Sequence, residues 1–215
     1  MPAARNHGDS GAVQQLPTRD LILDVAEKRF AEHGFAGVSV RQIAADAGLK
    51  NQASLYHHFK NKRALYKAVI ERGMAPIIEV IARSKTEPAG PVIDHLIDHL
   101  SEKPLLPRLI WRAGLDESED LRHIVGGALT PLFEMGFDAL SRSELDWEEE
   151  DLPHLAFGLF QLIFGYFAQI SLFEPITPIP PRSAEALERQ RRFLKLANAR
   201  LMGRPKNSNP SREPT

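Results

Sequence analysis

The sequence contains no cysteine, which excludes disulfide frameworks and metal sites built on thiolates. It also carries no excess of charge, because 27 Lys and Arg residues are balanced by 28 Asp and Glu residues. This balance argues against a protein that binds polyanions over its whole surface. Gly-rich phosphate loops, nucleophile elbows and the carboxylate pairs of glycosidases do not stand out either. We therefore expect neither an enzyme nor a bound cofactor.

Regular alternation of apolar and polar residues, typical of β-strands, is missing as well. Apolar residues recur instead at helical spacing, so the predicted fold class is all-α. Proline and glycine are expected to end or divide helices, at Pro88, Gly90 and Pro91, at Pro107, and at Gly126, Gly127 and Pro131. The expected helices cover residues 18–33, 40–47, 51–59, 62–87, 92–101, 105–114, 118–142 (as a pair), 152–173 and 183–202.

Charge is distributed unevenly along the chain. Residues 39–72 hold seven Lys and Arg against two Asp and Glu, whereas residues 116–151 hold two against twelve. A local basic segment on an otherwise acidic body is typical of a protein that docks on DNA by one end. Without a supporting motif, uneven solvated surfaces would explain the same pattern.

The segment from Ser39 to Lys62 has the pattern of two short helices joined by a tight turn. The Ser39 hydroxyl can cap the first helix, and Gly48 follows at the place where a helix ends in a left-handed residue. A second helix can begin near Asn51 and run to Phe59. Such a pair is a helix-turn-helix, whose second helix fits the DNA major groove. The expected inward positions are Val40, Ile43, Ala44, Ala47, Leu55 and Phe59.

The outward face of the second helix carries amide, hydroxyl and imidazole groups and no carboxylate. Such groups can pair with base edges or with phosphates. We expect Gln52, Ser54 and His57 to contact base edges. Lys50 and Asn51 are candidates too, because the helix can begin at either of them or at Gln52.

Residues 18–69 resemble the DNA-binding domain of the TetR family of bacterial transcriptional regulators. The likeness rests on three motifs, Phe30…Gly34-Phe35, Ile43-Ala44-x-x-Ala47-Gly48 and Leu55-Tyr56-x-His58-Phe59-x-x-Lys62-x-x-Leu65. The resemblance implies a homodimer that reads a palindromic operator. It also implies that Tyr56, His58 and Lys62 contact phosphates and that Arg41 reaches a base or a phosphate. For Lys62 there is a separate physical reason, because a phosphate would relieve the unfavourable position of a cation at the start of a helix.

Residues 155–173 contain no charged side chain. A stretch of this length could span a bilayer, but Gln161 and Gln169 lie inside it, so we expect no membrane partner and favour a buried helix at a core or subunit interface. Small and amide residues recur along one side of it, and leucines recur every seven residues near the C-terminus. Together the two helices can form a four-helix dimer contact. The predicted interface residues are Gly158, Gln161, Gly165, Gln169, Leu187, Leu194 and Leu201.

Aromatic side chains at helical spacing occur in the same half of the chain. Most such stripes belong to a core, but some can line a mostly apolar ligand pocket. The predicted lining residues are His99, Trp111, Phe133, Phe137, Phe160 and Phe164. His95 and His99 also stand four apart, a spacing that can hold a metal. Further ligands would have to come from Asp94, Asp98, His123 or His154, and we expect no metal site.

These patterns predict an N-terminal three-helix DNA-binding domain (residues 18–65) and a C-terminal helical ligand-binding and dimerisation domain (66–202), between a disordered arm (1–17) and a disordered tail (203–215). The first hypothesis is a cytoplasmic, homodimeric repressor that binds double-stranded DNA and responds to a small apolar or amphipathic effector. Two alternatives remain open: a helical small-molecule or metal-dependent enzyme, and a helical adaptor that binds protein through residues 155–173.

Overall fold

The computed structural model describes residues 18–83, 89–116, 118–142 and 147–203. The predicted arm and residues 204–215 of the predicted tail lie outside these ranges. Within them the chain forms helices and no strand, which confirms the all-α fold class. The elements are α1 (Thr18–His33), α2 (Val40–Asp46), α3 (Gln52–Tyr56), α4 (Lys62–Arg83), α5 (Ala89–Glu102), α6 (Leu105–Leu115), α7 (Glu119–Ser141), a short 3-10 turn (Glu149–Asp151), α8 (Leu152–Phe173) and α9 (Ala184–Leu201).

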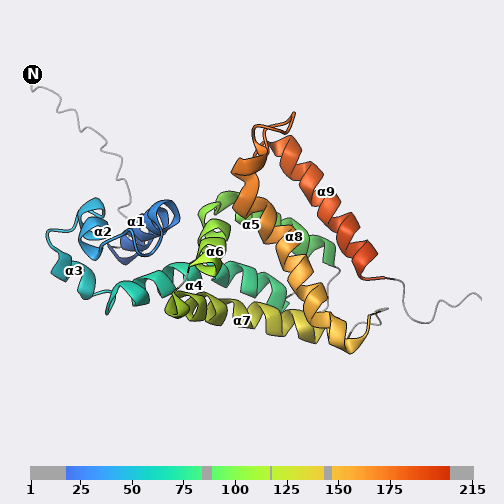
Figure 1. The fold of residues 1–215 in the computed structure, drawn as a ribbon, viewed down its shortest axis with the longest axis horizontal. Coiled ribbons are helices and arrows are strands. Elements are labelled where there is room, and N and C mark those ends of the chain that lie inside the picture. Colours follow the sequence, from blue (N-terminus) through green and yellow to red (C-terminus); the bar gives the residue numbers. More distant parts are fainter. Residues whose placement is uncertain (1–17, 84–88, 117, 143–146, 204–215) are drawn as a thin grey trace, which may run out of the picture.

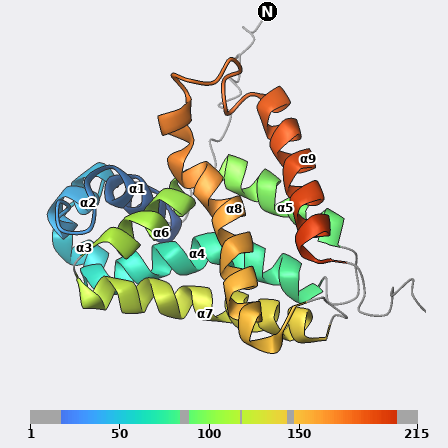
Figure 2. The ribbon, with the colours of Figure 1, turned by 45° about the vertical axis from the view of Figure 1, so that its right-hand side comes forward.

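The molecule is elongated, with α1, α2 and α3 gathered at one end (Figure 1). The long helix α4 leaves this end and runs into the larger part of the molecule, where α7 packs along it. Helix α8 crosses over this layer, and α9 packs beside α5. Figures 1 and 2 both show α8 and α9 joined at one end and spread apart toward the start of α8.

The predicted interruptions within residues 118–142 and at Pro107 are wrong, and α5 begins earlier than predicted. Helix α7 passes through Gly126, Gly127 and Pro131 without interruption, because its packing along α4 and α8 outweighs weak local propensity. Pro107 lies in the first turn of α6, where the backbone N–H has no partner inside the helix, so its absence costs little. For the same reason Pro91 is tolerated near the start of α5, which begins at Ala89.

One hydrophobic core runs through both ends of the molecule. It contains Ile22 and Phe30 of α1, continues through Ile70 of α4 and Ile97 of α5, and reaches Leu194 of α9. The predicted domain boundary at residue 65 falls inside α4, so the two regions share a helix and a core. A second, smaller cluster of Leu140, Leu152 and Leu155 closes the far end.

Charged side chains cross the junction between the two regions. Arg72 of α4 lies 2.8 Å from an Asp24 carboxylate oxygen and donates to Glu27 over 2.9 Å. Arg112 of α6 donates to the Glu32 carbonyl at the end of α1 over 3.5 Å. Gly34 follows that end with a φ of +73°, and a Cβ there would lie 2.9 Å from the Arg112 Nε. The first helix is therefore held against α4 and α6 by its own backbone end as well as by apolar packing.

Helix α8, with its leading 3-10 turn, is long and apolar enough to cross a membrane by length and composition. Soluble core helices pass the same test. Only 28% of its most apolar window is buried in the structure, so much of its apolar surface lacks cover within a single chain. Phe157, Leu172 and Phe173 of α8 are 54%, 71% and 42% exposed.

Candidate nucleic-acid interface

Local hydrogen bonds fix the start and end of α2. The Ser39 hydroxyl accepts from the Gln42 backbone N–H over 3.2 Å, and the Ser39 N–H donates to the Gln42 side chain over 2.8 Å. This reciprocal pair is a capping box. Gly48 ends the segment with a φ of +68°, a conformation that favours glycine. Both the cap and the left-handed glycine confirm the prediction.

Helix α3 is shorter than predicted. It begins at Gln52 and is capped by Asn51, whose side-chain oxygen accepts from the Ser54 backbone N–H over 2.9 Å. It ends at Tyr56 rather than Phe59, so His57 and His58 lie beyond its last residue. The chain turns there because Phe59 folds back into the core, where it is 5% exposed. The Phe59 backbone N–H still donates to the Leu55 carbonyl over 3.0 Å.

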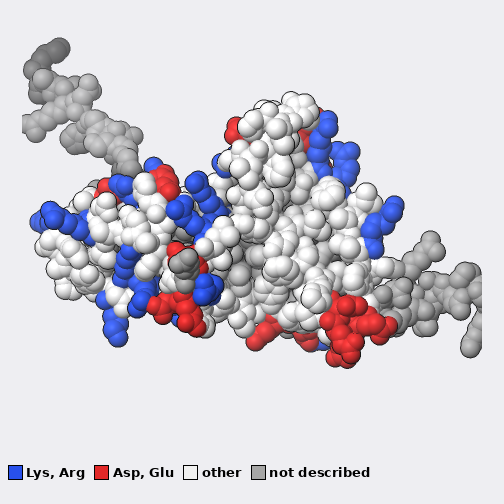
Figure 3. All heavy atoms as spheres, viewed as in Figure 1, with Lys and Arg blue, Asp and Glu red and all other residues white. Residues whose placement is uncertain are grey.

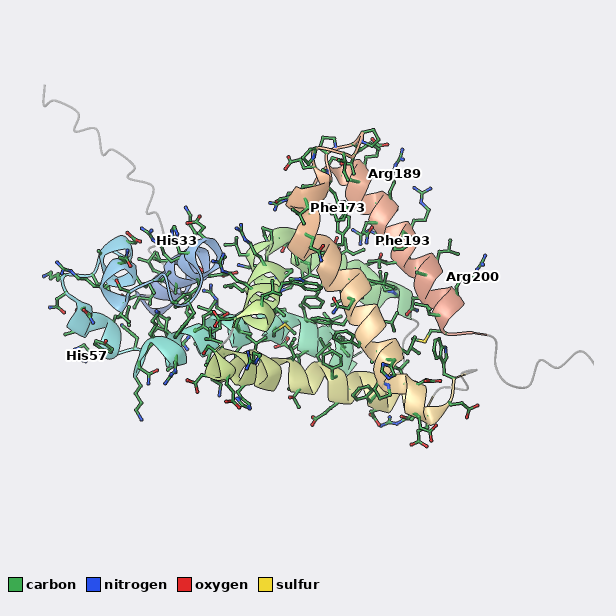
Figure 4. All side chains as sticks on the ribbon, viewed as in Figure 1. His33, His57, Phe173, Arg189, Phe193 and Arg200 are labelled. Carbon is green, nitrogen blue, oxygen red and sulfur yellow. The ribbon has the colours of Figure 1, made fainter. Side chains whose placement is uncertain are left out.

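Most of the residues predicted to contact DNA have exposed side chains, and the exceptions are Ser54 and Lys62. Tyr56 is 46% exposed, and its hydroxyl accepts from the Gln52 side-chain amide over 3.0 Å. Ser54 is half-buried and its hydroxyl already donates to Asn51 over 3.1 Å. The other exception is Lys62, which is also half-buried. The exposed candidates are Arg41, Lys50, Asn51, Gln52, Tyr56, His57 and His58, and Figure 4 shows His57 at the end of the molecule.

Lys62 is held by an aromatic ring. Its ammonium lies 4.2 Å from the centroid of the Phe35 ring, and burial lowers the pKa of the Lys62 amine from its ordinary value. The ring face attracts a cation. This contact offsets part of the cost of placing a cation at the start of α4. Asn61 caps the same helix by accepting from the Ala64 N–H over 2.8 Å.

The charge pattern distinguishes this end of the molecule. In Figure 3, Lys and Arg side chains surround the end formed by α2 and α3, and a large acidic cluster lies at the far end near the start of α8. Asp46 is the one carboxylate between Ser39 and Lys62, and it forms an ion pair with Arg29. The exposed face from Lys50 to His58 therefore presents cationic and neutral polar groups.

The residues predicted to line a ligand pocket are found mainly in ring-to-ring packing. Phe160 stacks on Phe164 with centroids 4.4 Å apart, and Phe133 lies 5.5 Å from Phe160 and 6.2 Å from Phe137. Trp111 packs beside Gly165 of α8. His99 bonds to the Gly73 carbonyl over 3.0 Å and ties α5 to α4. His95 instead bonds to the Pro91 carbonyl over 2.7 Å, so the two histidines do not converge.

The predicted dimer residues on α9 differ in exposure, because Leu194 is buried whereas Leu187 and Leu201 are half-buried. Leu194 is 3% exposed and belongs to the core, and Leu187 and Leu201 also pack against core clusters of their own chain. Phe193 and Leu196, which sequence reasoning missed, are the outward residues, at 51% and 56% exposed. The regular leucine spacing indicated an apolar stripe correctly, but such a stripe on a surface helix normally faces the core.

The predicted interface residues on α8 also differ in what they face. Gly165 faces inward, because a Cβ on it would lie 3.5 Å from the Trp111 ring. Gly158 and Gln161 instead line an open apolar hollow of about 480 Å³ between α8 and α9, together with Trp147, His154, Leu155, Leu162 and Leu201. Gln169 is half-buried.

A family model described as bacterial regulatory proteins of the tetR family matches residues 22–69. This segment runs from α1 through α3 and into α4. It therefore covers the helix-turn-helix and the two helices that brace it, and leaves the larger part of the molecule unmatched.

Individual relatives extend the likeness. The transcriptional repressor AcnR of Corynebacterium diphtheriae is 36% identical over 66 residues, which are 31% of this chain and 34% of AcnR. The transcriptional repressor SCO4008 of Streptomyces coelicolor is 31% identical over 99 residues, 46% of this chain and 50% of that protein. The matches thus span at most half the length of these curated relatives. The crystal structure of SCO4942 from Streptomyces coelicolor superposes with a TM-score of 0.59 at 28% identity, covering 88% of this chain and 100% of that one.

Proposed function

Because the chain belongs to the TetR family of bacterial transcriptional regulators, we propose that it is a repressor that binds double-stranded DNA as a homodimer. The observation that carries this proposal is the exposed face from Lys50 to His58, which combines cationic and neutral polar groups and has no carboxylate. A polyanion can approach such a face closely, and its side chains can pair with base edges in the major groove.

Within this face we assign roles by chemistry. Gln52 opens α3, and an amide is suited to bidentate pairing with adenine, so Gln52 is the leading base contact. Its hydrogen bond to Tyr56 holds both side chains on the outward side. Asn51 uses its carbonyl oxygen as a cap, which leaves its NH₂ group as the contact. Tyr56, His58 and Lys62 are assigned to phosphates, and Arg41 to a base or a phosphate.

The second proposal is that two copies associate through the outer face of α8 and α9. Exposed apolar patches of this kind mark interaction surfaces. Phe157 of α8 and Phe193 and Leu196 of α9 are large exposed side chains, and Gly158 lines the hollow between the two helices. A two-fold interface must be self-complementary, and this face offers both protruding rings and a hollow. Such a dimer would set two α3 helices about 34 Å apart, one turn of DNA.

The third proposal is that a small apolar or amphipathic effector binds the C-terminal region and changes DNA affinity by favouring one spacing of the two α3 helices. The enzyme and adaptor alternatives are not favoured, because the relatives are transcriptional repressors. A repressor of this kind works on the chromosome, so we assign it to the cytoplasm.

The decisive experiment is selection of bound fragments from random DNA by the purified full-length chain. We expect a palindrome whose half-sites lie about one turn apart, roughly 10 base pairs. Gln52→Ala should relax the preference at one base pair per half-site, and Lys103→Ala, on an exposed lysine after α5, serves as the control outside this face. Enrichment of no sequence at low salt would overturn DNA binding, and a single unrepeated half-site would overturn the dimer.

A further inference from the structure

A second, more enclosed cavity lies under the connector between α8 and α9. It has a volume of about 180 Å³. Its apolar wall is formed by Phe167 and Ile170 of α8 and Leu187 of α9, and Pro104 closes it at the start of α6. Ser101 and Arg182 supply the polar groups. A dry apolar cavity of about 150 Å³ in another protein is known to hold benzene, so this space fits one aromatic ring or a short alkyl chain.

Arg182 gives this cavity its chemical character. No hydrogen bond or ion pair joins its guanidinium to any other residue that the structure describes. Arg191, nine residues later, shows the opposite situation, because it pairs with Asp94, Asp98 and Glu188. The backbone beside Arg182 is held in place, since the Tyr166 hydroxyl donates to the Pro181 carbonyl over 2.8 Å. Arg182 is exposed, so its guanidinium stands at the rim of the apolar cavity without a protein partner among the described residues. A guanidinium in this position can bind the carboxylate of a ligand with two parallel hydrogen bonds.

We propose that this cavity binds a small carboxylic acid, with its ring or short chain among Phe167, Ile170 and Leu187 and its carboxylate on Arg182. A role for this acid as the effector of DNA binding rests on the proposed function. Binding itself requires nothing but the cavity and the cation.

The position of Pro104 connects the cavity with the DNA-binding end. Pro104 is the residue before the first turn of α6, and the other end of this 11-residue helix carries Arg112, which contacts the end of α1. Between them, the Tyr66 hydroxyl of α4 donates to the Leu109 carbonyl over 3.5 Å. A ligand that presses on Pro104 therefore acts on a helix that touches both α1 and α4.

The test uses calorimetric titration of benzoate into the full-length protein without DNA, with benzamide as the uncharged analogue of the same shape. Benzoate should bind about tenfold more tightly than benzamide, the factor expected of one charge-assisted pair. Arg182→Gln should remove that preference and leave benzamide binding unchanged. Ser101→Leu, which fills the cavity from a half-buried position, should abolish binding of both. Arg200→Gln, at the other end of α9 (Figure 4), is the matched control and should behave as the wild type.

Absence of benzoate binding to the folded wild type overturns the proposal. So does equal affinity for benzoate and benzamide, or binding that survives Ser101→Leu. Circular dichroism verifies that each variant is folded. A separate titration of operator DNA with and without benzoate tests the effector role: unchanged DNA affinity despite calorimetric binding overturns that role, and failure to bind any DNA overturns the proposed function while leaving the acid site in place.

Discussion

The end that carries α3 and the outer face of α8 and α9 are both exposed, but they differ in how they are built. The first is polar, and its helix starts are set by hydrogen bonds between residues three apart, at Ser39, Asn51 and Asn61. The second is apolar, and α9 is held by ion pairs from Arg191 and Lys195 to Asp94, about a hundred residues away in sequence. Hydrogen bonds between near neighbours in the chain therefore determine the polar surface, whereas contacts between residues far apart in the chain position the apolar one.

The largest loss of stability is expected from a substitution in the part of the hydrophobic core that supports the polar end. Phe30 is fully buried, with its ring centroid 5.1 Å from Tyr66 and 5.9 Å from Phe35. Phe30→Ala should lower the free energy of unfolding by about 3–5 kcal/mol, because it leaves a cavity in the core. Urea unfolding followed by circular dichroism measures this loss. A loss under about 1 kcal/mol would mean that the polar end is stabilised by its caps alone.

The apolar face is tested by a charge at its centre. Phe193→Asp should weaken self-association by at least about 2 kcal/mol, the cost of an aromatic hot-spot residue, and so favour the monomer. Sedimentation velocity over a range of concentrations measures this shift. The control is Leu115→Asp, on the last residue of α6, which is 79% exposed. Equal dissociation by both variants, or by neither, would contradict the assigned face.

Removal of one cap tests how local the polar end is. Asn51→Ala deletes the acceptor for the Ser54 N–H and should cost about 1 kcal/mol of stability, as is usual for such caps. Amide hydrogen exchange should rise in α3 and remain unchanged in α8. Asn198→Ala, on a half-buried residue of α9, is the comparison variant. Uniformly faster exchange along the whole chain would show that the cap stabilises more than its own helix.

Lys62 provides the test of the phosphate assignment. Lys62→Ala should weaken binding to every DNA sequence alike and reduce the slope of log affinity against log salt by about one. Fluorescence anisotropy at several salt concentrations gives the slope. Lys103→Ala, an exposed lysine after α5, should leave it unchanged. An unaltered slope in Lys62→Ala would indicate that the ammonium serves only its contact with the Phe35 ring.

The smallest loss of stability is expected from removal of the ion pairs that join Asp94 of α5 to Lys195 and Arg191 of α9. Burial opposes ionisation of Asp94, but hydrogen bonds from Lys195 and Arg191 outweigh it, so the pKa of Asp94 lies below its ordinary value. Such a carboxylate stabilises the fold above its unfolded pKa, about 3.9, and this contribution is lost as the pH falls through the folded pKa. Asp94→Asn should therefore cost about 0.5–1 kcal/mol at neutral pH. Thermal unfolding at a series of pH values should show this difference shrinking in acid, and a constant difference would contradict the pairing.

The same contrast explains what the sequence could predict. The bounds of α1 and α8, the cap at Ser39 and the left-handed Gly48 agree with the structure because each depends on neighbours in the chain. The end of α3 was misplaced because Phe59 is buried from a turn, which apolar spacing alone cannot separate from a helix.

Errors in the C-terminal region have another cause. Pro131 lies inside α7 and Leu194 of α9 is buried in the core of its own chain, and both depend on packing between elements far apart in sequence. The pairing of Phe35 with Lys62 is a contact of the same kind. Periodicity finds an apolar stripe but not the neighbour that covers it.

Gly34 and Arg112 have a consequence for engineered chimaeras. A regulator with a new operator is often sought by grafting a foreign N-terminal module onto an existing sensor. Here any side chain at residue 34 would be strained by its φ of +73° and would meet the Arg112 guanidinium. A graft that joins within α4 but brings another residue to this corner would strain the backbone there and displace Arg112 from its contact with α1. Successful donors should therefore be chosen for a glycine at this position before they are chosen for their recognition helix.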